Sequence, residues 1–195
     1  MTSVSGFSFR GKHVFLRPVE PEDLETLYAW ENDPEIWHVS NTLTPFSKDV
    51  LRSYLLNAHR DILETRQFRF IIILQEMGLD RSSSEQPGVP IGTIDLFDYD
   101  PHHSRAGIGI LIKDPDQRRK GYASEALEIL CRYGFEILLL HQLYCNITSG
   151  NVASLKLFRN HGFDIAGTKR EWNKTAGGWE DEILLQKINR DHLPN

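Results

Sequence analysis

A basic, glycine-containing segment precedes a stretch of helical periodicity in the second half of the chain. Arg118, Arg119, Lys120 and Gly121 follow a short turn after a strand pattern, and apolar residues then recur at helical spacing from about Tyr122. Backbone N–H groups at a helix N-terminus bind phosphate. Cations at this end oppose the helix dipole, so three together suggest that a bound anion neutralises them. The segment is a candidate phosphate-binding loop, although the charges taken alone also fit a solvated basic turn.

The strand pattern before this loop, over residues 104–113, is nearly bare on one face. Alanine and isoleucine occupy alternate positions on one side, while Gly107 and Gly109 occupy the other. Glycine in a strand lets a ligand or another backbone approach closely, or marks a bulge. Further along, Asn151 precedes an amphipathic stretch and predicts a capped helix over 151–161, ended by Gly162.

Two common nucleotide-binding patterns are missing, since the chain has no G-x-x-x-x-G-K-[ST] and no G-x-G-x-x-G after a strand. Residues 118–123 instead resemble the R/Q-x-x-G-x-G/A pyrophosphate loop of the GCN5-related N-acetyltransferase (GNAT) superfamily. Residues 151–163 are similar to the N-x-x-(A/S)-x-x-L-(Y/F)-x-x-x-G-F signature of that family. Residues 16–24 resemble the L-R-P-x-x-x-x-D-L opening of its ribosomal-protein N-terminal and spermidine acetyltransferase branch. The resemblance covers nearly the whole chain.

The resemblance implies acetyl-CoA as co-substrate. Backbone groups of Ile110, Leu111 and Ile112 would hydrogen-bond the pantetheine arm as if it were an added strand. The pyrophosphate would lie on the loop, whose cofactor-binding residues are Arg118, Arg119, Lys120, Gly121, Tyr122 and Ala123. Asn151 would contact the cofactor arm near its helix start, and Phe158 would face the same end of the cofactor.

Chemistry in this family is direct attack of a neutral amine on the thioester, which needs a proton acceptor and a proton donor. Many members place a tyrosine acid where this chain has Phe158, which has no proton to donate. The ribosomal-protein branch carries a serine at the position of Ser154, one helical turn earlier, so Ser154 is the catalytic candidate for protonating the thiolate. Its hydroxyl could equally bond its own helix backbone. Tyr144 is a weaker donor candidate.

The general base is left open by the sequence. The spermidine branch has a glutamate on the fourth strand where this chain has Gly107. The candidates are Asp95, Asp98, His102, His103, Glu171, Glu180 and Asp181, acting directly or through water. For each one alone, a solvated surface charge is the alternative role.

The acceptor should be a primary amine that arrives as a cation. The acidic residues Glu31, Asp33 and Glu35, just before Trp37, could attract it. A polyamine, another small-molecule amine such as an aminoglycoside, and a peptide or protein N-terminus all fit. Because Phe158 and Gly107 depart from the family pattern, a catalytically silent acetyl-CoA-binding sensor is the alternative, and a non-acetyl acyltransferase is a third candidate.

The elements that must position these residues form an α/β (α+β) fold. Apolar patterning predicts strands over 7–18, 68–74, 91–97, 104–113, 143–148, 163–172 and 179–187, and helices over 20–31, 47–62, 122–139 and 151–161. Ser47 is the expected cap of the second helix. The order predicts a single GNAT-like domain, with a mixed, mostly antiparallel sheet of about seven strands flanked by helices.

Composition limits the class of protein. The 195 residues are 40% hydrophobic and 25% charged, as expected for one domain over 1–195, with a flexible surface loop at 79–90. A net charge of −5 provides no pervasive positive field, so nucleic acid is not an expected partner. No apolar stretch approaches the roughly 20 residues that cross a bilayer, and the start lacks a signal-peptide core. We therefore expect no membrane partner and a cytoplasmic location.

Metal-binding patterns are also missing from the sequence. The two cysteines, Cys131 and Cys145, form no C-x-x-C pair and are expected to be buried apolar residues. The eight histidines are scattered, so no metal is expected. Edge strands near the C-terminus allow a homodimer.

Overall fold

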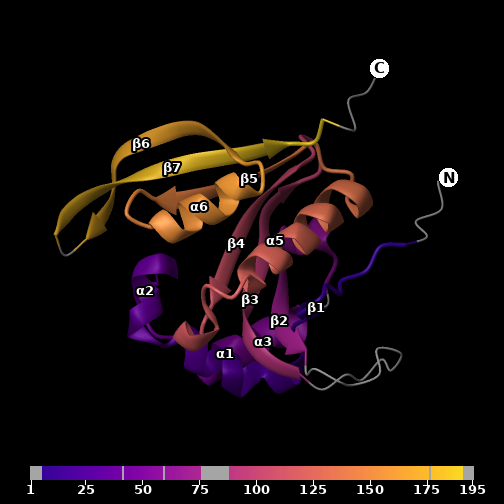
Figure 1. The fold of residues 1–195 in the computed structure, drawn as a ribbon. Helices are drawn as coiled ribbons and strands as arrows, with labels where there is room; N and C mark the ends of the chain where they lie inside the picture. The colour runs from indigo at the N-terminus through magenta and orange to yellow at the C-terminus, as the bar shows by residue number, and fades with distance from the viewer. Residues whose placement is uncertain (1–5, 41, 59, 76–87, 176, 191–195) are drawn as a thin grey trace.

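A seven-stranded sheet forms the centre of the computed structural model, which describes residues 6–40, 42–58, 60–75, 88–175 and 177–190 (Figure 1). The strand order is β1-β2-β3-β4-β5-β7-β6, and every neighbouring pair is antiparallel except β4 and β5. The strands are β1 (Val14–Pro18), β2 (Phe68–Gln75), β3 (Gly88–Asp100), β4 (Arg105–Ile112), β5 (Gln142–Thr148), β6 (Asp164–Thr175) and β7 (Gly178–Ile188). The predicted fold class is confirmed.

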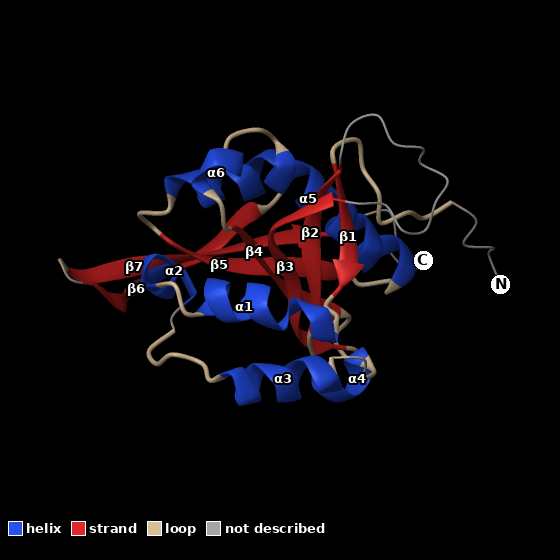
Figure 2. Cartoon of the chain, turned by 90° about the horizontal axis from the view of Figure 1, so that it is seen from below, coloured by secondary structure: helices blue, strands red, loops and turns tan. Residues whose placement is uncertain are grey.

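Helices cover both faces of this sheet (Figure 2). On one face lie α1 (Leu24–Glu31) and α3 (Lys48–Asn57), with the short helices α2 (Pro34–Ser40) and α4 (Ile62–Thr65) beside them. On the other face lie α5 (Tyr122–Arg132), which continues into one π-helical turn (Tyr133–Ile137), and α6 (Val152–Asn160). No helix among the described residues is both long and apolar enough to span a bilayer.

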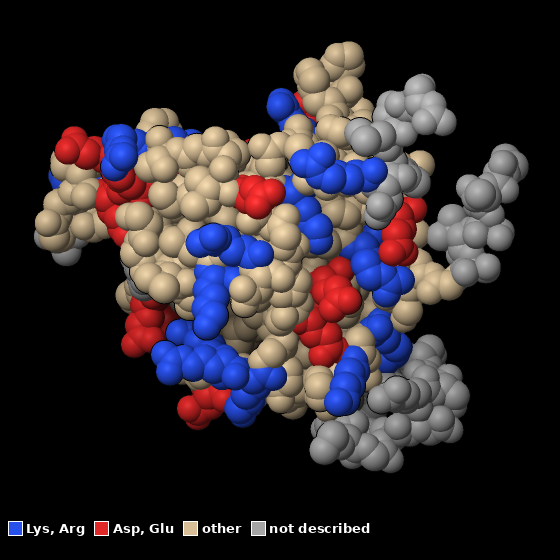
Figure 3. All heavy atoms as spheres, turned by 45° about the horizontal axis from the view of Figure 1, so that its top comes forward, with Lys and Arg blue, Asp and Glu red and all other residues tan. Residues whose placement is uncertain are grey.

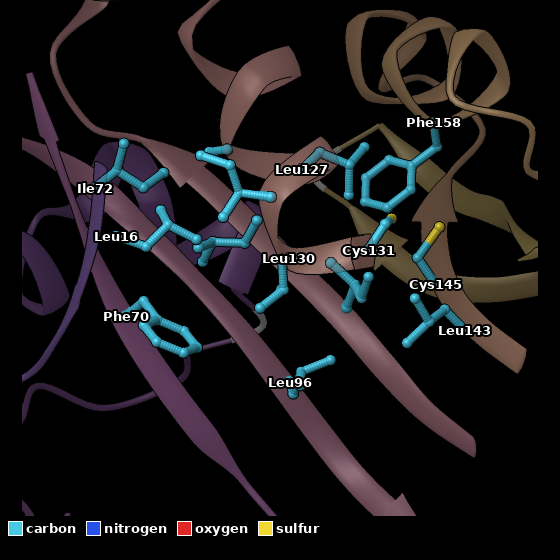
Figure 4. Close-up of a cluster of buried hydrophobic side chains, with 14 of the residues drawn as sticks. Leu16, Phe70, Ile72, Leu96, Leu127, Leu130, Cys131, Leu143, Cys145 and Phe158 are labelled. Atoms are coloured by element: carbon cyan, nitrogen blue, oxygen red, sulfur yellow. The ribbon is translucent and has the colours of Figure 1, made fainter. Parts of the chain in front are cut away.

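Alternate residues of the central strands supply two separate cores. Phe70 and Ile72 join the larger core under α5, which Figure 4 shows, whereas Ile71 and Ile73 join the smaller core under α1 and α3. A strand buried on both faces reads as a continuous apolar run, which is why 68–74 was identifiable from sequence. The expected burial of both cysteines is confirmed, since Cys131 and Cys145 lie in the larger core.

The L-R-P opening motif has a structural basis in an ion pair. Arg17 donates two hydrogen bonds of 2.7 Å to the carboxylate of Asp23, which also accepts the backbone N–H of Glu20 at 2.8 Å. Bidentate arginine–carboxylate pairs are geometrically specific. This motif therefore anchors the turn between β1 and α1.

Several predicted boundaries were wrong. The strand expected over 7–18 is confined to β1, and the helix expected over 47–62 ends at Asn57 before α4 begins. Ser47 caps α3 as expected, since its Oγ accepts the N–H of Val50 at 3.2 Å. Helix α2 was not predicted, because its short sequence shows no repeated apolar face.

The expected loop at 79–90 falls partly outside the described residues. Residues 79–87 are not described, and 88–90 belong to β3, which pairs with β2 from Gly88 onward. The strand therefore begins earlier than the expected Ile91, and a register shift opposite Ile72 and Ile73 accommodates Pro90 within it.

Candidate active site

The parallel strands β4 and β5 pair over only three residues. Arg105, Ala106 and Gly107 pair with residues 142–144, and beyond that point β4 stays bonded to β3 while β5 stays bonded to β7 (Figure 1). Among the residues that the structure describes, no strand pairs with the edge of β4 from Ile108 to Ile112 on the β5 side. Unpaired backbone groups at a strand edge are a template for another extended chain.

The candidate phosphate loop lies at the end of this edge. Gly121 precedes α5 with φ 89°, a left-handed conformation that favours glycine, and an added Cβ there would meet no atom within 4 Å. The Arg118 guanidinium donates to the carbonyl oxygens of Ile112 at 3.0 Å and Lys113 at 3.2 Å, so this side chain fastens the loop to β4. The loop from Arg118 to Gly121 is exposed, and α5 begins with no side-chain cap on its N–H groups.

The second motif helix, α6, contacts the first turn of α5 through its C-terminal end, where His161 Nε2 lies 3.0 Å from Ser124 Oγ. Asn151 Oδ1 accepts the N–H of Ser154 at 3.1 Å, which confirms the predicted cap. Ser154 is half-buried on the first turn of α6. Lys and Arg side chains gather on part of the face that Figure 3 presents. Lys156 and Arg159 of α6 are exposed, as are the three cations of the loop.

Phe158 lies inside the molecule. Its side chain is 2% exposed and points toward Leu127 and Cys131, and its ring packs edge-on against Phe163 with centroids 5.0 Å apart (Figure 4). A cofactor contact would require this ring to leave the larger core. The burial of Phe158 gives its ring a packing role, and the cofactor contact that the resemblance implied stays a prediction.

A pocket of about 160 Å³ opens on the face of the sheet that carries α1. Five elements line it, and they include the unpaired edge of β4. The lining residues are Trp30, Glu31, Ile36, Arg69, Thr93, Asp95, Gly109, Ile110 and Leu111. We call this pocket the acidic pocket, because two carboxylates and one guanidinium leave it one net negative charge.

Arg69 connects the two carboxylates of the acidic pocket. Its Nε donates to Asp95 Oδ1 at 2.6 Å, its Nη1 donates to Glu31 Oε1 at 2.6 Å, and its guanidinium lies 5.7 Å from the Tyr54 ring centroid. Burial raises the pKa of the Asp95 carboxyl above its ordinary value, and Arg69 only partly offsets this. Burial alone would lower the pKa of Arg69, but Asp95 and Glu31 raise it above its ordinary value.

A second, wider pocket of about 560 Å³ lies where β4 and β5 are still paired. It is lined by Arg66, Asp98, Tyr99, Asp100, Arg105, Gln142, Tyr144, Leu184 and Gln186. Tyr144 donates its hydroxyl proton to Asp98 Oδ2 at 3.2 Å. Burial and the negative charge of Asp98 raise the pKa of Tyr144 to about 12, so the phenol keeps its proton at neutral pH.

The remaining candidates for the general base lie outside the acidic pocket, and several bind other partners. His103 bonds Asp100 at 2.8 Å and packs against His102, while Glu180 accepts the N–H of Gly150. Asp181 binds Arg170 and the backbone N–H of Glu171. Of the candidate bases, Asp95 alone lines the acidic pocket.

The acidic stretch before Trp37 divides in the structure. Glu31 lines the acidic pocket, Asp33 is paired with Lys113, and Glu35 is exposed. Arg69 and Trp30 were not predicted. An arginine inside the apolar run 68–74 was the available signal, because a cation on a buried strand requires a carboxylate partner.

No group of three or more His, Cys, Asp or Glu side chains is placed to hold a metal ion in the part of the chain that the structure describes.

The seven-stranded, mostly antiparallel sheet with parted β4 and β5 defines a mixed α/β fold with an open strand edge beside a helix N-terminus. A family model described as "Acetyltransferase (GNAT) domain" matches residues 13–164. The chain belongs to the GNAT acetyltransferase family and is an N-acetyltransferase, an enzyme class that transfers acetyl groups to amines.

Relatives in sequence support this assignment. The chain is 29% identical over 178 residues to an uncharacterized N-acetyltransferase p20 of Bacillus licheniformis, covering 91% of this chain and 93% of the relative. It is 28% identical over 157 residues to a spermidine N(1)-acetyltransferase of Escherichia coli K12, covering 79% and 74% of the two chains.

Solved structures share the fold. A ribosomal-protein-S5-alanine acetyltransferase from Vibrio fischeri superposes with a TM-score of 0.77 at 21% identity, covering 97% of this chain and all of the other. A spermidine N-acetyltransferase from Vibrio cholerae, in complex with CoA and spermine, gives 0.76 at 23% identity and covers 91% of this chain and 96% of the other.

Proposed function

We propose that this N-acetyltransferase binds acetyl-CoA between β4 and β5 and acetylates a primary amine that enters from the acidic pocket. The observation that carries the proposal is the parting of β4 from β5 after three paired residues. The free edge then lies between an exposed helix N-terminus on one side and a pocket of net negative charge on the other.

The cofactor half of the proposal assigns backbone groups to acetyl-CoA. The edge of β4 at Ile110–Ile112, where Arg118 already binds the Ile112 carbonyl oxygen, would hydrogen-bond the pantetheine arm, and the N–H groups of 118–123 would hold the pyrophosphate. Asn151 would hold the start of α6 in place beside the arm, and Ser154 would donate a proton to the leaving thiolate. Family membership and a neighbouring structure that contains CoA support this placement.

The net negative charge of the acidic pocket supports the proposed entry of the acceptor amine. A primary amine is an ammonium ion near neutral pH, and one net negative charge in a half-enclosed pocket favours it. Relatives and neighbours are named for spermidine, spermine and an N-terminal alanine of a ribosomal protein. The proposed acceptor is therefore a small-molecule amine or a peptide N-terminus.

Assembly and location stay predictions. The edge strand β6 exposes Ile165 and Trp172, and it is the surface through which we expect two copies to pair. One structural neighbour, a spermidine N-acetyltransferase of Vibrio cholerae, is described as dodecameric. A cytoplasmic location remains an expectation from the sequence.

Substitution Gly121→Glu tests the cofactor site. The new carboxylate repels phosphate and the side chain is strained at φ 89°, so acetyl-CoA binding should fall by at least about 100-fold. Isothermal titration calorimetry measures the affinity directly. Gly178→Glu is the matched control, because Gly178 also has positive φ, 127°, and would meet no atom within 4 Å.

Unchanged binding in Gly121→Glu, or an equal loss in Gly178→Glu, would remove the loop from the site. A second measurement identifies the acceptor, through release of free CoA thiol with spermidine, spermine, aminoglycosides and short peptides with free N-termini. Turnover with one class supports the proposed function, and tight binding without turnover on any amine favours the silent sensor.

A further inference from the structure

We propose that Asp95 is the general base of this enzyme and that Arg69 and Glu31 position it to receive a proton from the acceptor ammonium. The inference deepens the proposed function and rests on it. It assigns the base to β3, where the resemblance had pointed to β4 and found only Gly107.

The position on β4 is closed to a larger side chain. A Cβ added at Gly107 would lie 2.4 Å from the ring of Phe97, which stands directly opposite on β3. The ring therefore occupies the space that a glutamate at 107 would need. A carboxylate on this face must come from another strand.

Asp95 supplies a carboxylate two residues farther along this pair of strands. It stands directly opposite Gly109, and its Oδ2 lies 3.8 Å from where a Cβ on Gly109 would be. Gly109 therefore leaves the carboxylate uncovered toward β4. The next residues of β4 are the free edge to which the thioester arm is assigned.

The two oxygens of Asp95 are held unequally. Oδ1 accepts the Arg69 Nε–H at 2.6 Å, whereas Oδ2 is 3.4 Å from Arg69 Nη2. The long second contact leaves Oδ2, the oxygen nearer β4, as the better proton acceptor. Glu31 holds the far side of the guanidinium at 2.6 Å, so Arg69 cannot turn to close on Oδ2 without breaking that bond.

The pocket also matches the ammonium that brings the proton. Asp95 and Glu31 together exceed the charge of Arg69 by one, and Trp30 places an aromatic side chain in the same lining. Cations bind over aromatic faces and beside carboxylates. Burial raises the pKa of Asp95 above its ordinary value, which makes it a stronger base than a solvated aspartate.

The acceptor R–NH3⁺ gives one proton to Asp95 Oδ2, and the nitrogen lone pair then forms a C–N bond with the thioester carbonyl carbon. The tetrahedral species collapses, the C–S bond breaks, and the thiolate takes the second amine proton through Ser154. Asp95 returns its proton to water.

The pH dependence of wild-type kcat/KM tests the proposal without any substitution. If Asp95 accepts a proton from a bound ammonium, the rising acid limb reports Asp95 and stays at one pH for acceptors of different amine pKa. The groups that face Asp95 are Arg69 from β2, Glu31 from α1 and Tyr54 from α3. All three belong to the protein, so they do not change when the acceptor amine is changed. An acid limb that moves with the pKa of the amine would overturn the proposal.

Substitution Asp95→Asn provides the second test. We expect kcat/KM for an ordinary primary amine to fall by about 10²- to 10⁴-fold, while acetyl-CoA affinity stays within about threefold. The deficit should shrink toward the wild-type rate for an acceptor whose amine pKa lies below the assay pH, because that amine arrives neutral. A deficit independent of amine pKa would indicate only lost packing and would refute the base assignment.

Asp100→Asn is the matched control, since Asp100 also pairs with an arginine of the sheet, Arg105, at 3.2 Å. The acid limb of the Asp100→Asn variant, and the dependence of its kcat/KM on the amine pKa, should equal those of wild type.

Substitution Arg69→Lys tests whether Arg69 positions Asp95. It should move the acid limb of kcat/KM while leaving acetyl-CoA affinity unchanged. An unmoved limb would exclude Arg69 from the positioning role. Failure of wild type to bind acetyl-CoA would refute the proposed function, whereas binding and turnover with an unchanged Asp95→Asn profile would refute this inference alone.

Discussion

Two arginine–aspartate pairs on the same sheet behave in opposite ways. Arg69 and Asp95 lie 16–19% exposed in the acidic pocket, and burial raises the pKa of Asp95. Asp100 pairs with the 46% exposed Arg105 in the wide pocket, and hydrogen bonds from His103 with the charge of Arg105 lower its pKa to about 2. The same two residue types thus give a base in one place and a firmly ionised carboxylate in the other, because desolvation dominates only in the first.

The two ion pairs should also differ in how much each contributes to the stability of the fold. Removing one partner of a buried pair leaves an uncompensated charge, whereas an exposed pair contributes little. Substitutions in the two pairs and at the glycines beside them measure this difference.

Arg69→Met should cause the largest loss of stability. The substitution leaves Glu31 and Asp95 facing each other in a half-closed pocket, and we expect the free energy of unfolding to fall by about 3–5 kcal/mol. Arg105→Met, the control in the exposed pair, should lose about 0–1 kcal/mol. Urea denaturation measures both. Similar losses in the two variants would contradict the contrast.

Gly107→Ala should have a smaller but clear effect. Its Cβ would lie 2.4 Å from the Phe97 ring, so the ring must move, and we expect a loss of about 1–3 kcal/mol. Gly109→Ala is the matched control on the same strand, because its Cβ would meet Asp95 at an ordinary 3.8 Å. Thermal unfolding distinguishes the two. Equal stability of both variants would show that Phe97 does not close this position.

Asp100→Asn should lower stability above about pH 4, and the difference from wild type should shrink in acid. The folded pKa of about 2 lies below the ordinary value of 3.8, so Asp100 stabilises the fold above about pH 4 and loses this effect as the pH falls toward 2. The variant should therefore lose less stability than wild type between pH 4 and pH 2, as measured by urea midpoints. If the urea midpoints of the variant and of wild type fall in parallel with pH, the contacts of Asp100 with His103 and Arg105 do not form in solution.

Local signals allowed much of the chain to be predicted. Caps at Ser47 and Asn151 were predictable because each oxygen bonds an N–H three residues later. The apolar run at 68–74 was identifiable as a strand buried on both faces. Boundaries were less predictable, and α2 was missed, because a seven-residue helix carries too few periodic positions to be recognised.

The candidate site was only partly predictable. The resemblance pointed to the loop at 118–123 and to Ser154, whose roles stay proposals. The resemblance implied a cofactor contact for Phe158, and the structure buries its ring in the larger core, because the face of α6 that carries Phe158 packs on that core. Asp95 was one base candidate among several until the acidic pocket separated it from the others.

Local sequence patterns were enough to identify the family, the order of the elements and the residues that cap or begin the helices. These depend on neighbours within a few positions, which any short stretch of chain carries with it. The tertiary structure alone decided that Glu31, Arg69 and Asp95 meet, because they lie 38 and 26 positions apart and are joined only by strand register and the packing of α1. Which carboxylate is desolvated, and which is not, follows from that packing.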